Sequence, residues 1–211
     1  ATKSKEIWGV PCPIFIRSIA MEGGMGPVAG SSHHSIYYRM PGIKIISPMT
    51  PKEYEYAYKK FLLDDDVYYV SEHRGSYDNS SELTDIAIDN CDIVLFPISI
   101  TRFEAEKARA ILLEKDIKAS IFHQLWIKPF DIKDKWISSL KSSRYGGLVL
   151  DDDYDDGVAK SIAHKIMMKC DRKVYTLGLD DRTAGFHESV DNLPPTAEKI
   201  VHEVERIISL A

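Results

Sequence analysis

Residues 41–53 constrain the fold of this chain more than any other stretch, because a strand signal and a helix start follow one another directly. A Pro-Gly turn leads into a short β-branched run made of Ile43, Ile45 and Ile46. Thr50 then offers an N-cap hydroxyl, Pro51 suits the first helical position, and Glu53 completes the pattern of a capping box. We therefore expect a strand that ends near Ser47 and a helix that begins at the following Pro.

The predicted helix carries an apolar stripe at the i, i+3, i+4, i+7 and i+8 positions, formed by Tyr54, Ala57, Tyr58, Phe61 and Leu62. Residues 64–66 are all Asp and end the helix, and residues 67–70 begin another strand. Two strands joined through a helix are normally parallel, with a right-handed crossover. The unit is therefore typical of an α/β sheet rather than of a barrel or a helical bundle.

The same alternation returns in the second half of the chain. We predict strands at residues 92–97, 117–122, 147–150 and 173–177, and helices at residues 101–112, 132–140, 158–168 and 195–210. The first of these helices starts with a second capping-box pattern, from Thr101 to Glu104. Four strands that alternate with four helices indicate a second doubly wound sheet.

The remaining segments have weaker patterns. Residues 3–8 are interpreted as a loop, and residues 10–17 as a buried strand with its prolines at the beginning. Residues 71–82 are polar and rich in turn formers, which is typical of a linker between domains. The trio Glu72-His73-Arg74 within it is either catalytic or a charged strand end that makes ion pairs.

Composition excludes several classes of function. A chain of 211 residues can form one large domain or two small ones, and a net charge of -5 disfavours partners that need a basic field, such as nucleic acid or an anionic membrane. Three widely spaced cysteines indicate neither a disulfide framework nor a zinc site, so a reducing cytoplasm is the expected setting. There is no apolar run of about 18 residues that could span a membrane. A start at Ala1 hints at a trimmed or processed chain.

The most site-like stretch is the loop at residues 21–35, which is rich in Gly and Ser and ends with His33, His34 and Ser35. It follows a predicted strand, and open α/β sheets bind their ligands beyond the carboxyl ends of strands. Its glycines would let the backbone pass close to a ligand, although their spacing is not that of a dinucleotide fingerprint. An imidazole can exchange protons near neutral pH. The alternative is a flexible surface loop with two solvated or backbone-bonded histidines.

A run of carboxylates at residues 151–156 invites a second interpretation. It lacks the spacing and the terminal Glu of an EF-hand loop, and the simplest expectation is that the carboxylates charge the N-terminus of the following helix. A metal site is an alternative that we do not adopt. A second hypothesis is an acidic patch, including Asp152 and Asp153, that docks a basic partner.

The order of these segments resembles the beta subunit of thiamine-diphosphate-dependent 2-oxo acid dehydrogenases, of which pyruvate dehydrogenase is one, and the C-terminal half of transketolases. The resemblance covers nearly the whole chain. It is carried by residues 41–51, by the acidic strand at residues 65–72, by the Lys-Pro-Phe-Asp turn at residues 128–131, and by the lead-in to the last helix at residues 192–200.

The resemblance implies an α/β protein with two parts. Residues 1–76 would form the second half of a pyrimidine-binding α/β domain, and residues 77–86 a linker. Residues 87–211 would form a transketolase C-terminal-like α/β domain with a mostly parallel sheet. The family's loop histidine falls on His34, or on His33 in the transketolase-like register, where it would act on the substrate carbonyl.

The same resemblance implies cofactor-binding residues and partners. Glu22, Gly24, Gly26 and Ser35 would contact substrate or cofactor, and no residue is assigned to a metal. Thiamine diphosphate and Mg2+ would be held mainly by a partner chain or a missing segment, because no Gly-Asp-Gly motif and no activating glutamate are found. The expected partners are an alpha-type subunit, a second copy through the C-terminal domain, and an acyltransferase core.

The sequence thus favours a component of a thiamine-diphosphate-dependent enzyme that cleaves a C–C bond next to a carbonyl, as in 2-oxo acid decarboxylation and dehydrogenation. It would be active only with a partner chain, in the cytoplasm. One alternative is ketol transfer of the transketolase kind. Another is a non-catalytic dimerisation or docking module, and a weaker one is a nucleotide- or flavin-binding α/β protein.

Overall fold

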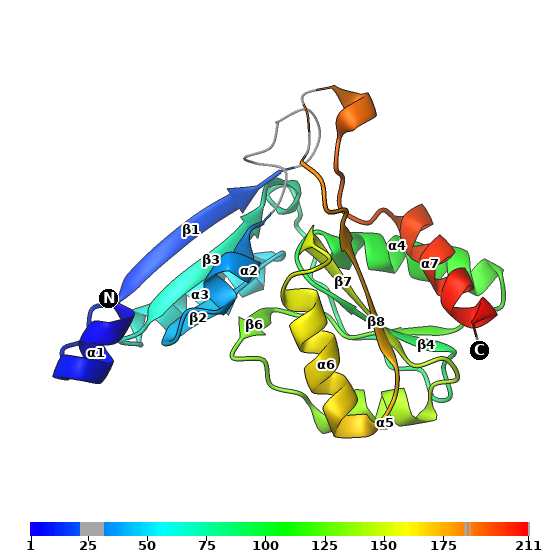
Figure 1. Cartoon of the computed structure of the whole chain (residues 1–211), viewed down its shortest axis with the longest axis horizontal. Coiled ribbons are helices and arrows are strands. Elements are labelled where there is room, and N and C mark those ends of the chain that lie inside the picture. Colours follow the sequence, from blue (N-terminus) through cyan, green and yellow to red (C-terminus); the bar gives the residue numbers. More distant parts are fainter. Residues whose placement is uncertain (22–31, 184, 186, 211) are drawn as a thin grey trace.

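Two sheets of four strands each form the framework of the molecule (Figure 1). The computed structural model describes residues 1–21, 32–183, 185 and 187–210. The first sheet contains β1 (Ile14–Ala20), β3 (Val67–His73), β2 (Ile43–Ile46) and β6 (Trp126–Lys128), in that order. The second contains β5 (Ala119–Ile121), β4 (Ile93–Pro97), β7 (Gly147–Tyr154) and β8 (Val174–Leu179). Every pair in either sheet is parallel except β2 with β6.

Helices cover both faces of the second sheet, as the alternation of the sequence predicts. One face packs against α5 (Asp134–Ser142) and α6 (Val158–Cys170), and the other against α4 (Thr101–Glu114) and α7 (Ala197–Ser209). The first sheet carries α3 (Pro51–Leu62) on one face. The shorter elements are α1 (Thr2–Trp8), α2 (His34–Tyr38), η1 (Arg74–Ser76) and η2 (Glu188–Val190). The α/β fold class and the parallel sheets are therefore confirmed.

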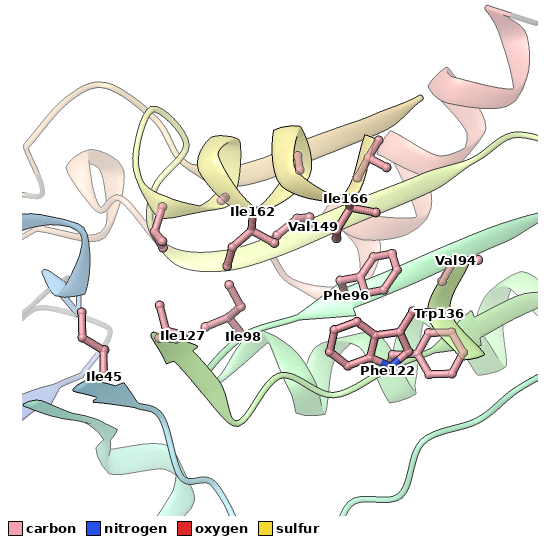
Figure 2. Close-up of a cluster of buried hydrophobic side chains, with 14 of the residues drawn as sticks. Ile45, Val94, Phe96, Ile98, Phe122, Ile127, Trp136, Val149, Ile162 and Ile166 are labelled. Atoms are coloured by element: carbon pink, nitrogen blue, oxygen red, sulfur yellow. The ribbon is translucent and has the colours of Figure 1, made fainter. Parts of the chain in front are cut away.

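One apolar core joins the two sheets. Ile45 of β2 and Ile127 of β6 belong to the same buried cluster as Ile98 and Val149 from the second half of the chain (Figure 2). The strand β6 makes this connection, because it comes from the second half of the sequence and pairs with β2. Burial of so much apolar surface between the sheets fixes the position of each relative to the other.

Several local expectations are wrong. Residues 3–8 lie in the helix α1 and not in a loop, and β1 starts only at Ile14. β1 is not a buried strand, because within the described residues it pairs on one side only, with β3, and Ala20 is its one buried residue. The predicted linker at residues 71–82 begins inside β3, where Ser71, Glu72 and His73 are buried, and continues into η1.

Both predicted capping boxes are replaced by tertiary contacts. The hydroxyl of Thr50 donates to Glu82 instead of capping α3, and Glu53 accepts from the Met49 amide and forms a paired ion bridge with the guanidinium of Arg102. In α4 the N-cap is the preceding Ile, and Glu104 accepts from an amide at the start of α7. Both glutamates therefore bind long-range partners, and Glu53 also keeps the Met49 amide as a local one.

Candidate functional site

The end of the predicted ligand loop docks onto the carboxyl end of β7. The Ser32 hydroxyl donates to Asp152, and the Ser35 amide donates to an Asp153 oxygen at 2.9 Å. His34, which lies between Ser32 and Ser35 in the chain, has its Nε2 atom 3.0 Å from Asp151 Oδ1. All of these contacts join residues near the end of the first sheet to the second sheet. We call Ser32, His34, Ser35 and Asp151–Asp153 the junction cluster.

Apart from Ser35, which is half-buried, the junction cluster is almost completely excluded from solvent. His34 and Asp151 are 0% exposed, and Asp152 and Asp153 are 1% and 2% exposed. The other ring nitrogen of His34, Nδ1, lies 3.1 Å from the Ser71 hydroxyl of β3. Asp152 also accepts from the hydroxyl of Ser99, at 2.6 Å, so each carboxylate has a hydrogen-bond donor. Buried charges are tolerated in proteins when they are paired in this way.

The charges of the cluster follow from its burial. Burial by itself would lower the pKa of His34, but the neighbouring carboxylates, Asp151 first, raise that pKa to about 9. Burial raises the pKa of Asp151 and of Asp152, against the opposing effect of the imidazolium. Asp153 is also buried, yet the His34 charge and the amides that it accepts from lower its pKa. At neutral pH the imidazole of His34 is therefore positively charged.

Ser35 also caps the N-terminus of α6, a helix that lies more than a hundred residues later in the chain. Its hydroxyl accepts from the amide of Val158, the first residue of α6, at 2.9 Å. Gly157 precedes that helix, and a Cβ atom there would come within 2.3 Å of the Ser35 hydroxyl oxygen. The Gly in the sequence is thus explained by the close approach of the loop.

The predicted site residues fall into three groups. His34 and Ser35 are brought together with the acidic run, whereas His33 is half-buried at the start of α2 with a positive φ of 55°. Glu22, Gly24 and Gly26 lie outside the described residues. The catalytic and binding roles of all of them stay predictions.

The interpretation of the acidic run is corrected for its first three residues. Asp151–Asp153 lie inside β7, not at the N-terminus of α6, and they bind the loop. A docking patch that includes Asp152 and Asp153 is wrong as well, because neither carboxylate reaches the surface. Sequence reasoning missed their role because charged residues are rarely fully buried. The sequence feature that could have indicated their burial is that Asp151–Asp153 directly follow the apolar residues of a central strand.

The Glu72-His73-Arg74 trio contains one ion pair, as one of its two interpretations predicts. Glu72 is 1% exposed and accepts from Arg17 Nε at 2.6 Å and Nη2 at 2.8 Å. The hydroxyl of Tyr77 donates to the same carboxylate at 2.7 Å. His73 accepts from the Gly75 amide. Glu72 is therefore held by two protein groups, the Arg17 guanidinium and the Tyr77 hydroxyl.

The described residues do not by themselves fit a complete thiamine-diphosphate site. Within the described ranges, the group with metal-ligand geometry is His34, Asp151 and Asp152, whose ligand atoms lie within 4.8 Å of one another. All three are bound by other protein groups, and His34 exposes no surface to a ligand. Neither a diphosphate with its Mg2+ nor a thiazolium ring has a place at this cluster.

Comparison with known proteins defines the class of fold. No family model matches the chain, and no curated protein matches it. Among solved structures, its fold is that of transketolase-like α/β proteins. A chain described as split gene transketolase, inactive beta4 tetramer, matches with a TM-score of 0.71 and 17% identity, over 93% of this chain and 66% of that chain. The chain thus spans about two thirds of its neighbour's length, and at this identity the likeness shows the fold alone. In the described part of the chain, no helix is long and apolar enough to cross a membrane.

Proposed function

We propose that this chain is a beta-subunit-type component of a thiamine-diphosphate-dependent enzyme that decarboxylates a 2-oxo acid, with a partner chain that holds the diphosphate and Mg2+. The observation that carries the proposal is the transketolase-like fold over 93% of the chain. The neighbour is itself described as a split-gene chain in a beta4 tetramer, which supports a partner chain and self-association. An acyltransferase core is a further partner in this proposal.

The proposal divides the chain at residues 77–86, with residues 1–76 as part of a pyrimidine-binding domain and residues 87–211 as the C-terminal domain. Within the first part it assigns the role at the reacting carbonyl to His33. Of the two loop histidines, His33 is the one with exposed surface, and His34 is enclosed by the junction cluster. In this proposal His34 positions the loop, and Glu22, Gly24, Gly26 and Ser35 remain binding candidates on the same loop.

The experiment that tests the proposal uses the protein purified from its source, with native mass measurement and analysis of released cofactors. We expect a partner subunit and thiamine diphosphate in the same complex, and turnover of pyruvate or another 2-oxo acid. In that complex, His33→Ala should lower turnover with little change in cofactor affinity. His34→Ala should instead lower stability. A chain that associates only with itself and releases no thiamine diphosphate would refute the proposal.

The burial of His34 favours a second candidate. A histidine paired with Asp151 and Asp153 serves the attachment of two sheets and needs no cofactor. A non-catalytic dimerisation or docking module would preserve this cluster and lose the rest of the site. Normal turnover in both histidine variants of an active complex, or the lack of any activity with every 2-oxo acid and sugar phosphate tested, would favour the module. Ketol transfer would be recognised by activity on sugar phosphates alone.

A further inference from the structure

A cavity of about 440 Å³ lies at the carboxyl edge of the first sheet, beside the edge strand β1. Its walls come from β1, from the first two turns of α3 and from the segment that follows β3. Open α/β sheets bind ligands at the carboxyl ends of their strands, and cavities of this size hold small molecules. Neither the fold comparison nor the loop histidines assign a role to this cavity.

Among the residues that line the cavity, Arg17 carries the charge, on its guanidinium. Glu72 occupies one edge of it, through Nε at 2.6 Å and Nη2 at 2.8 Å. Glu72 is buried and also accepts from Tyr77, so the guanidinium is held in one orientation. In the described part of the chain, both hydrogen bonds of defined geometry that the guanidinium makes go to Glu72, and the Tyr77 hydroxyl is a second neighbour that interacts with it. The second edge consists of Nη1 and the other Nη2 hydrogen. Two parallel N–H donors on one edge match the two oxygens of a carboxylate.

Aromatic rings form the rest of the wall. Tyr54, Tyr58 and Tyr77 line the cavity together with Arg17. The Tyr58 ring stacks on Phe15, with centroids 4.8 Å apart and an interplanar angle of 29°, so its position is fixed. The Tyr54 hydroxyl lies 2.7 Å from the Ser76 hydroxyl, which holds the second ring. Rigid aromatic walls favour a flat ring by offset or edge-to-face packing.

We propose that this cavity binds a small aromatic carboxylate, whose carboxylate takes the second edge of Arg17 and whose ring packs against the tyrosines. The ion pair with Glu72 offsets the charge of Arg17, so charge attraction alone gives little binding. The flat ring and the paired hydrogen bonds are both needed for affinity. The site is independent of the proposed enzyme activity.

The test is a titration of 4-fluorobenzoate with the purified full chain, followed by 19F NMR. We expect a saturable shift that benzoate reverses and that cyclohexanecarboxylate reverses several-fold less well, because the latter has the charge without the flat ring. Arg17→Lys keeps the charge but loses the fork, and should weaken binding by about tenfold. Tyr58→Leu should weaken it by about fivefold.

The matched control is Tyr56→Leu, on the same helix. Tyr56 and Tyr58 are each 42% exposed, but Tyr56 packs against Trp126 and does not line the cavity. Its variant should bind 4-fluorobenzoate as the unchanged chain does. Absence of saturation, equal affinity for cyclohexanecarboxylate, or equal losses in the two tyrosine variants would each overturn the proposal. If circular dichroism shows that Arg17→Lys does not fold, the tyrosine pair and the competitor comparison still decide.

Discussion

Because buried His34 is charged in the folded chain, we expect the free energy of unfolding to depend on pH. The folded chain raises the His34 pKa from its ordinary value of 6.5 to about 9, whereas the unfolded chain keeps the ordinary value. The folded state therefore holds a proton between these values that the unfolded state has lost. At about 1.4 kcal/mol for each pKa unit, this proton contributes about 3 kcal/mol to the free energy of unfolding. That contribution is complete below pH 6.5 and is lost as the pH rises through 9.

The assay is urea unfolding at intervals from about pH 6 to about pH 9.5, with the free energy extrapolated to water. The unchanged chain should lose about 3 kcal/mol over this range, a large share of the roughly 5–15 kcal/mol of an ordinary domain. His34→Gln removes the titrating group and should flatten the profile. Asp151→Asn should flatten it partly, because Asp151 is the main cause of the raised His34 pKa.

The control is His202→Gln, which removes an exposed imidazole from α7 and should leave the steep profile intact. A profile for the unchanged chain that is flat across the tested range would refute the reasoning. So would an equally steep decline in the His34→Gln chain, since the lost proton would then belong to another group.

Two further predictions concern the ion pair between Glu53 and Arg102 and the close approach of the backbone at Gly146. Glu53→Gln leaves the guanidinium of Arg102, which is 1% exposed, without its charge partner, and should lower the free energy of unfolding by about 3–5 kcal/mol. Glu55→Gln removes one partner of an exposed ion pair on the same helix and should leave the free energy of unfolding nearly unchanged. Urea unfolding distinguishes them, and similar losses would contradict the assignment. Gly146 has a φ of +90°, and a Cβ atom there would lie 2.2 Å from a backbone oxygen, whereas Gly9 also has a positive φ but its Cβ would meet open space. Gly146→Ala should therefore lower the free energy of unfolding by at least about 2 kcal/mol more than Gly9→Ala does. Equal thermal midpoints of the two glycine variants would show that the close approach at Gly146 does not constrain the turn.

Much of the fold follows from periodicity in the sequence. The strand at residues 43–46 and the helix at residues 51–62 lie where the Pro-Gly turn and the Thr-Pro start predict them. The four strands and four helices of the second half are also present, and the apolar residues that predict them lie in the two buried clusters on either face of the second sheet. β6 was not predicted, since three residues are too few to show a period and its partner β2 is far away in the sequence.

The candidate site was less predictable than the fold. The sequence singles out the loop and both histidines, but it cannot tell which imidazole is enclosed, because His33 and His34 are adjacent and chemically identical. Their difference arises from the acidic run, which is more than a hundred residues away in the chain. The capping-box patterns failed for a related reason. Glu53 accepts from the Met49 amide and not from the Thr50 amide that a capping box requires, and its charge is paired with the buried guanidinium of Arg102.

The junction cluster explains how residues 32–35, the end of the predicted ligand loop, are held in place at a cost in charge burial. Ala20, where β1 ends, belongs to the first sheet, while Ser32 and His34 bind carboxylates of the second. Replacing a buried ionic group by an apolar one often leaves stability unchanged or raises it, so net stability alone is a weak reason for burying three carboxylates and one imidazolium. Apolar contacts are non-directional, so an apolar cluster would not fix the orientation of the loop end. Hydrogen bonds to defined oxygen atoms fix the rotation of the loop end as well as its distance. A loop end that is fixed in this way places His33, the neighbouring residue in the chain, at one defined position at the carboxyl edge of the sheets.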